Sequence, residues 1–132
     1  MSRPSDPPSR GASRRALGDY GERLAESFLV ERGYGMIARN VHTRVGEIDR
    51  IALCGETLCF VEVRLRRSRR YGSSADSVDP RKQMRLVRAA RAWLARRVAP
   101  PHVALRFDVV AIDASSEPPR IELYQDAFRC DA

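Results

Sequence analysis

The chain has 132 residues, of which 43% are hydrophobic and 31% are charged, a composition typical of a globular protein with one domain. Its net charge is +7, because 24 residues are Lys or Arg and 17 are Asp or Glu, and this favours an anionic partner. No apolar run approaches the roughly 18 residues of a membrane-spanning helix, and the opening residues lack the apolar core of a secretory signal. The three cysteines form no CxxC pair, so we expect reduced thiols, a cytoplasmic location and no membrane contact.

The N-terminal half predicts an arm, a helix and three extended segments. Residues 1–14 are rich in Pro, Ser and Arg, and we expect a disordered arm there, followed by a single domain over residues 15–132. Apolar residues at helical spacing predict a helix over residues 17–32, which Gly33 ends. The expected extended segments are residues 36–39, 46–53 and 58–63. Gly55 and Glu56 join the last two as a β-hairpin.

The C-terminal half predicts one more helix and two more strands. A loop rich in Arg, Gly and Ser over residues 68–77 precedes a helix that opens at Asp79-Pro80 and continues to about Val98. Strands are expected at residues 103–112 and 121–124. The order is therefore α-β-β-β-α-β-β. A strand, a crossover helix and another strand favour a parallel pair, and hence an α/β fold with a mixed sheet flanked by helices.

The basic residues are concentrated between positions 64 and 97. This window holds twelve basic and two acidic residues, a net charge of +10, so the rest of the chain carries −3. An arginine-rich genome would explain why Lys82 is the only lysine, but it explains this imbalance less well. The distribution indicates a surface that faces phosphates.

Two acidic residues in the predicted hairpin are the main candidates for chemistry. Strand alternation places Glu62 on the face of Leu58 and Phe60, and Asp49 at one end of another apolar stripe. If the hairpin register sets Asp49 beside Glu62, their repulsion would be relieved by a hard divalent cation, Mg²⁺ or Mn²⁺. The alternative is a structural ion pair between Glu62 and Arg64, with Asp49 near the surface.

Several strings of this sequence resemble the YraN-like family of uncharacterised bacterial proteins. They are YGERLAESFLVERGY, GEIDRIALCGETLCFVEVRLRR, VDPRKQMRL and RFDVV. The resemblance as a whole covers about residues 18–110 in register. That family is assigned to the restriction-endonuclease-like superfamily, whose nuclease motif is an acidic residue followed by a strand with Glu-x-Lys. The resemblance therefore implies a restriction-endonuclease-like fold and a metal-dependent nuclease site.

The resemblance also implies roles for particular residues. Asp49, Glu62 and the main-chain carbonyl of Val63 would bind the metal, and Glu22 from the first helix would assist through water or a second ion. Arg64 stands where the superfamily motif has lysine. Arginine stays protonated and cannot act as a general base, although it could hold a phosphate through two hydrogen bonds.

Two functions follow, and a third remains open. The first is a metal-dependent DNA endonuclease that acts on structured repair or recombination intermediates, and the second is a non-catalytic nucleic-acid-binding module on the same fold, which Arg64 favours. The third is an adaptor whose basic helix docks an acidic protein. DNA is preferred to RNA as the partner, and the oligomeric state stays open, a homodimer included. The residues expected to contact the nucleic acid are Arg66, Arg67, Arg69, Arg70, Arg81, Lys82, Arg85 and Arg88.

Other polar residues point to structure rather than chemistry. We expect Asp108 to pair with Arg106 or to have a hydrogen-bonded structural role, and Trp93 to belong to the core. His42 and His102 lack the spacing of metal ligands.

Overall fold

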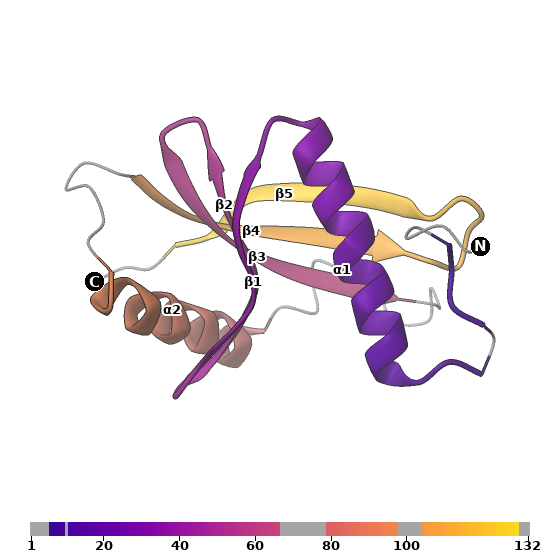
Figure 1. Cartoon of the computed structure of the whole chain (residues 1–132), viewed down its shortest axis with the longest axis horizontal. Coiled ribbons are helices and arrows are strands. Elements are labelled where there is room, and N and C mark those ends of the chain that lie inside the picture. The colour runs from indigo at the N-terminus through magenta and orange to yellow at the C-terminus, as the bar shows by residue number, and fades with distance from the viewer. Residues whose placement is uncertain (1–5, 10, 67–78, 98–103, 130–132) are drawn as a thin grey trace.

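The computed structural model describes residues 6–9, 11–66, 79–97 and 104–129, which form a five-stranded mixed sheet and two helices (Figure 1). The elements follow the predicted order α-β-β-β-α-β-β: α1 Arg14–Glu31, β1 Gly35–Thr43, β2 Gly46–Cys54, β3 Thr57–Arg66, α2 Pro80–Ala95, β4 Ala104–Asp113 and β5 Arg120–Phe128. Neither of these helices is long and apolar enough to cross a membrane. The predicted fold class is confirmed.

The strands lie in the sheet in the order in which they occur along the chain. The pairs β1–β2, β2–β3 and β4–β5 are antiparallel, whereas β3 and β4 are parallel. The parallel pair is the one predicted from the intervening helix, since a strand can return in the same direction only after a long crossover. The predicted hairpin is β2 and β3, which join at Gly55 and Glu56.

Several elements are longer than the sequence pattern predicts. Helix α1 begins at Arg14 rather than Leu17, because the Ser13 hydroxyl accepts a hydrogen bond from the Ala16 N–H at 3.2 Å and caps the first turn. Strands β1 and β5 extend beyond residues 36–39 and 121–124. The sequence pattern missed the extra residues because both are edge strands, in which three residues of β1 and four of β5 are polar and exposed. Residues 1–5 and 10 of the expected arm lie outside the described residues.

The two helices cover opposite faces of the sheet. Leu58 and Phe60 of β3 pack in the core cluster that contains the apolar face of α2. Cys59 and Val61 pack in the cluster that contains α1. Successive residues of a strand point to opposite faces, so β3 is buried on both sides and forms the centre of the molecule.

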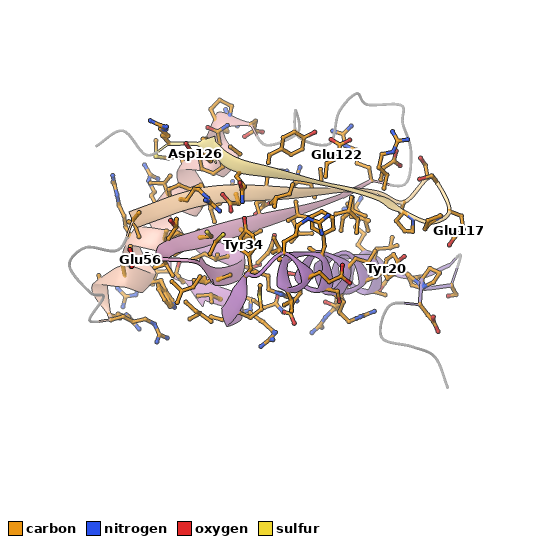
Figure 2. The ribbon with its side chains drawn as sticks, turned by 90° about the horizontal axis from the view of Figure 1, so that it is seen from above. Tyr20, Tyr34, Glu56, Glu117, Glu122 and Asp126 are labelled. Carbon is orange, nitrogen blue, oxygen red and sulfur yellow. The ribbon has the colours of Figure 1, made fainter. Side chains whose placement is uncertain are left out.

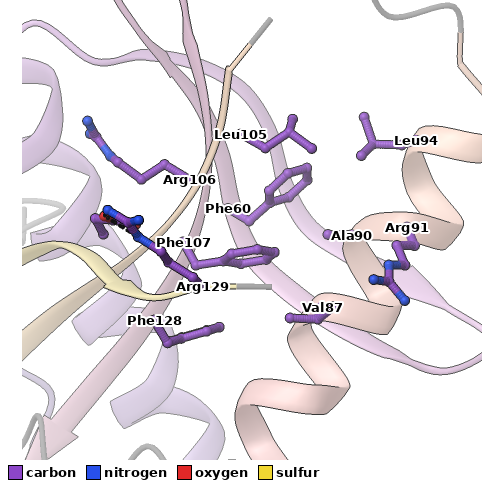
Figure 3. A pocket seen from close by; sticks show the side chains of 11 residues that line it. Phe60, Val87, Ala90, Arg91, Leu94, Leu105, Arg106, Phe107, Phe128 and Arg129 are labelled. Atoms are coloured by element: carbon purple, nitrogen blue, oxygen red, sulfur yellow. Dashed lines mark hydrogen bonds and ion pairs between the residues drawn. The ribbon is translucent and has the colours of Figure 1, made fainter. Parts of the chain in front are cut away.

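An aromatic row extends from the α2 core to the end of β5. The Phe60 and Phe107 ring centroids lie 5.6 Å apart, and those of Phe107 and Phe128 lie 5.1 Å apart. Figure 3 shows these rings beside α2 in a cavity of about 540 Å³. Trp93 meets Phe60 edge to face at 6.0 Å, so Trp93 belongs to this core, as predicted.

A buried polar cluster fixes β4 and β5 to the start of β1. The fully buried Asp108 carboxylate accepts hydrogen bonds from Arg106 Nε at 2.8 Å and from the Tyr34 hydroxyl at 2.9 Å, so the predicted pair is confirmed. Gln125 donates to the Tyr34 hydroxyl, and the Asp126 N–H donates to Asp108 across an irregularity in the β4–β5 pairing. Figure 2 shows Tyr34 in the interior and Asp126 near the end of β5.

We expect Asp108→Asn to lower the free energy of unfolding by about 3 kcal/mol, because the substitution leaves the partly buried Arg106 guanidinium without its counter-charge. Asp126→Asn is the matched control, since it weakens only the exposed pair with Arg129 and should cost less than about 1 kcal/mol. Urea denaturation measures both. Equal losses would show that the Asp108 cluster contributes no more than a surface ion pair.

Candidate active site

The site forms where the β2–β3 hairpin opens. Regular pairing extends from the turn to Arg50 and Val61, and the next pair in register would be Asp49 with Glu62. At this point the Asp49 carboxylate accepts a hydrogen bond from the Val63 N–H at 2.8 Å, in place of a main-chain carbonyl. The structure therefore brings the two predicted carboxyl groups together, and Asp49 lies in the gap between the strands.

Helix α1 brings a third carboxyl group to the same place. A Cβ atom added at Gly21 would lie 3.3 Å from Leu65 Cβ, so the glycine lets α1 approach β3 closely. Glu22 is the next residue, and its side chain interacts with that of Asp49. A cavity of about 480 Å³ opens here, lined by Arg14, Leu17, Gly18, Glu22, Asp49, Val63 and Leu65.

We call these three carboxyl groups the carboxyl site. Burial raises the pKa of each of them above its usual value. Burial and the adjacent Asp49 charge raise the pKa of Glu62 to about 8, although the positive charges of Arg64 and Lys82 act in the opposite direction. Burial and Asp49 also raise the pKa of Glu22 to about 7. Burial raises the pKa of Asp49 as well. The carboxyl site therefore favours a bound proton or another cation.

The donor set of the carboxyl site fits a hard divalent cation. Carboxylate and carbonyl oxygens are the ligands that Mg²⁺ and Mn²⁺ prefer. In a strand the N–H and C=O of one residue point to the same side, so the Val63 carbonyl faces the gap that holds Asp49. Glu22 and Glu62 both interact with Asp49, which raises the pKa of each. As the side chains stand, however, no group of three or more Asp, Glu, His or Cys residues in the described ranges could hold a metal ion.

Arg64 extends the carboxyl site towards solvent. Its Nη1 atom lies 3.6 Å from Glu62 Oε1, and both side chains are about one-fifth exposed. The ion pair that the sequence offered as an alternative is therefore present, and it coexists with the contact between Glu62 and Asp49. Arg64 presents a permanent positive charge beside the carboxyl groups.

Arg50 is a part of the site that sequence reasoning missed. Its side chain is only 5% exposed, its Nη1 donates to the Asp49 carbonyl at 2.7 Å, and the same atom lies 3.7 Å from Glu22 Oε1. Its Nε donates to Glu26 at 2.9 Å, and Glu26 also binds Arg39. The available signal was a cation within the strand sequence IDRIAL of residues 48–53. Arg50 therefore links α1 to β2 next to the carboxyl site.

Some of the basic residues predicted to contact nucleic acid lie near the carboxyl site. Lys82 is half-buried near Glu62, and Arg66 lies at the end of β3. One face of α2 is basic and exposed, and we call it the α2 basic face: Arg81, Arg85 and Arg88. Arg67, Arg69 and Arg70 lie outside the described residues.

The remaining candidates do not join the carboxyl site. His42 is exposed, and its Nδ1 lies 2.9 Å from Glu47 Oε1. Cys54 and Cys59 are free thiols, as expected. His102 lies outside the described residues.

Comparison with known proteins identifies relatives of similar length. Residues 21–112 match the family model described as "Uncharacterised protein family UPF0102". A UPF0102 protein of Nitrosococcus oceani is 41% identical over 121 residues, which are 92% of this chain and 98% of the relative. Another, of Symbiobacterium thermophilum, is 47% identical over 115 residues, which are 86% of this chain and 97% of the relative. The predicted resemblance to the YraN-like family is confirmed.

The raised pKa values of Glu62 and Glu22 predict how the stability of the metal-free protein depends on pH. Between about pH 5 and pH 8 the folded chain holds protons that the unfolded chain has already lost. The free energy of unfolding should therefore fall as the pH rises through this range, as measured by thermal denaturation in EDTA. Glu62→Gln should flatten the slope, whereas Glu56→Gln, at the exposed hairpin turn, should leave it unchanged. Parallel slopes in the two variants would contradict the assignment.

Proposed function

Since the chain belongs to the uncharacterised protein family UPF0102, we propose a function from the chemistry of its own carboxyl site: a metal-dependent endonuclease that hydrolyses phosphodiester bonds in DNA. The observation that carries this proposal is the convergence of Glu22, Asp49 and Glu62 at the opening of the β2–β3 hairpin, beside a basic helix. Structural carboxyl groups are normally paired with cations rather than with each other, and such clusters of perturbed carboxyl groups mark functional sites.

Each side chain has a role in the proposed reaction. Asp49, Glu62 and the Val63 carbonyl would hold Mg²⁺ or Mn²⁺, and Glu22 would contact it through water. When bound, the ion lowers the pKa of a water molecule and neutralises charge on the phosphate. The Asp49 carboxylate stays oriented because it accepts the Val63 N–H. Glu22, which lines the same cavity as Asp49, would take a proton from the attacking water.

Arg64 takes the position of the lysine in the nuclease motif. Its guanidinium cannot remove a proton, but it can donate two hydrogen bonds to a phosphate and stabilise the negative charge that develops there. Its pair with Glu62 holds it at the rim of the carboxyl site. Lys82 and the α2 basic face would bind the flanking phosphates, which supply affinity without sequence preference.

A non-catalytic nucleic-acid-binding module is the second candidate. The observation that favours it is Arg64, because the ion pair with Glu62 supplies part of the positive charge that a metal ion would otherwise bring. In this case the carboxyl site would keep its protons, and the basic residues would bind DNA without cleaving it.

The endonuclease proposal predicts metal-dependent cleavage of supercoiled plasmid or of a four-way junction in Mn²⁺. Asp49→Asn and Glu62→Gln should each reduce the rate by at least about 100-fold, since each removes a charged oxygen ligand. Glu56→Gln, on the same hairpin but at its far end, is the control and should cleave at the wild-type rate. Wild-type protein that cleaves neither substrate, or variants as active as wild type, would overturn the proposal.

Substitution of Arg64 separates the two candidates. If Arg64 contacts the phosphate during cleavage, Arg64→Gln should lower kcat by about 100-fold and Arg64→Lys should retain most of the rate. If Arg64 has instead replaced the catalytic lysine in a binding module, the wild type should be inactive and Arg64→Lys should gain activity. Steady-state cleavage of a labelled junction distinguishes these outcomes.

A further inference from the structure

A second hollow lies between β1 and the C-terminal half of α2, and we call it the β1–α2 groove. Its volume is about 580 Å³, and its lining residues are Ala38, Val41, His42, Thr43, Arg44, Ala92, Trp93, Arg96 and Arg97. None of these residues is acidic, and none lines the cavity of the carboxyl site. The groove is thus a separate surface of positive charge.

Two residues of the β1–α2 groove are held in place by ring contacts: Trp93 packs on the core, and Arg97 lies over Trp93. Trp93 packs edge to face on the core ring of Phe60 at 6.0 Å. The Arg97 guanidinium lies 4.6 Å above the Trp93 ring, which restricts its rotation before any ligand binds. In the described part of the chain neither Arg44 nor Arg96 forms an ion pair, so their charges are available to a ligand.

The cavity beside the aromatic row differs in this respect. Figure 3 shows three arginines at this cavity, Arg91, Arg106 and Arg129. Arg106 is paired with the buried Asp108, Arg129 is paired with Asp126, and Arg91 also interacts with another residue. Charge complementarity to an anion therefore favours the β1–α2 groove.

Helix α2 connects the carboxyl site to the β1–α2 groove. Lys82 acts on Glu62 at one end of the helix, and Arg96 lines the groove at the other. Between them the helix packs closely on the β1–β2 turn, since a Cβ atom at Gly46 would lie 3.3 Å from the Arg85 carbonyl oxygen. At 1.5 Å per residue, Lys82 and Arg96 are about 21 Å apart along the axis. One DNA strand advances 3.4 Å per nucleotide, so this separation corresponds to roughly six nucleotides.

We propose that the β1–α2 groove binds the phosphate backbone of DNA about six nucleotides away from the carboxyl site. Arg44, Arg96 and the oriented Arg97 contact phosphates there, while the α2 basic face follows the backbone between the two sites. This inference rests on the proposed function for the class of partner, but not on cleavage. Its consequence is that a substrate must extend past the carboxyl site along α2 to be held tightly.

Binding of labelled DNA hairpins in EDTA tests the groove without turnover, with stems of about 6 and about 18 base pairs. Arg44→Gln/Arg96→Gln should weaken binding of the long stem roughly 30-fold at 0.15 M salt, because each lost phosphate contact lowers the salt slope by about 0.9. The short stem, which covers fewer of the basic residues at once, should bind the wild type more weakly than the long stem does. The control Arg32→Gln/Arg129→Gln removes the same charge from exposed positions outside the groove and should change neither.

Each result decides the question. Equal weakening by the two double variants would overturn the proposal, because net charge alone would then explain the binding. So would a wild-type affinity that is independent of stem length, or an absence of DNA binding. If the wild type binds as expected but cleaves no substrate, the groove stands and the endonuclease proposal fails.

Discussion

The early end of the β2–β3 pairing determines the whole carboxyl site. Had the two strands continued to pair beyond Arg50 and Val61, the Val63 N–H would have met a main-chain carbonyl, and Asp49 would have pointed away from the strand edge. Instead the Asp49 carboxylate satisfies that N–H at 2.8 Å and lies between the strands. Because the carboxylate accepts this main-chain hydrogen bond, it is held in one orientation, whereas a carboxylate exposed to solvent could adopt several rotamers. Glu22 and Glu62 are then arranged around it.

Charge balance is the second constraint that follows from this geometry. Three carboxyl groups in one partly buried region repel each other, and the chain opposes this repulsion from two sides. Arg50 lies beneath the site, 3.7 Å from Glu22, and Arg64 lies at its rim, 3.6 Å from Glu62. These two cations do not restore ordinary ionisation, since the pKa values of Glu22 and Glu62 stay near 7 and 8. The remaining deficit of positive charge is what a divalent cation would supply.

The parts that local pattern controls were predictable, and the parts that depend on packing were not. Period-2 alternation and a turn at Gly55 predicted the hairpin and the face of each carboxyl group, but the sequence left the register conditional. The structure supplies it, because the pair that would follow Arg50 and Val61 is Asp49 with Glu62. The approach of α1 was not predictable, since the role of Gly21 depends on its contact with Leu65, which lies 44 positions further along the sequence. The burial of Arg50 was missed for the same reason. Its partner Glu26 lies on α1, and the β2 sequence alone does not predict that ion pair.

The separation of the carboxyl site from the basic surface has a physical reason. A cluster of carboxyl groups repels a phosphate backbone, so the residues that would do the chemistry cannot also supply the affinity. Arg50 and Arg64 already offset part of the negative charge of the carboxyl site, and more positive charge there would oppose the binding of a divalent cation. A helix that starts beside Glu62 and leads away from it avoids this conflict, because its arginines attract the backbone at a distance where they act weakly on the carboxyl groups. Under the proposed function, the +10 window would bind the substrate, and the net-negative remainder would supply Glu22, Asp49 and Glu62.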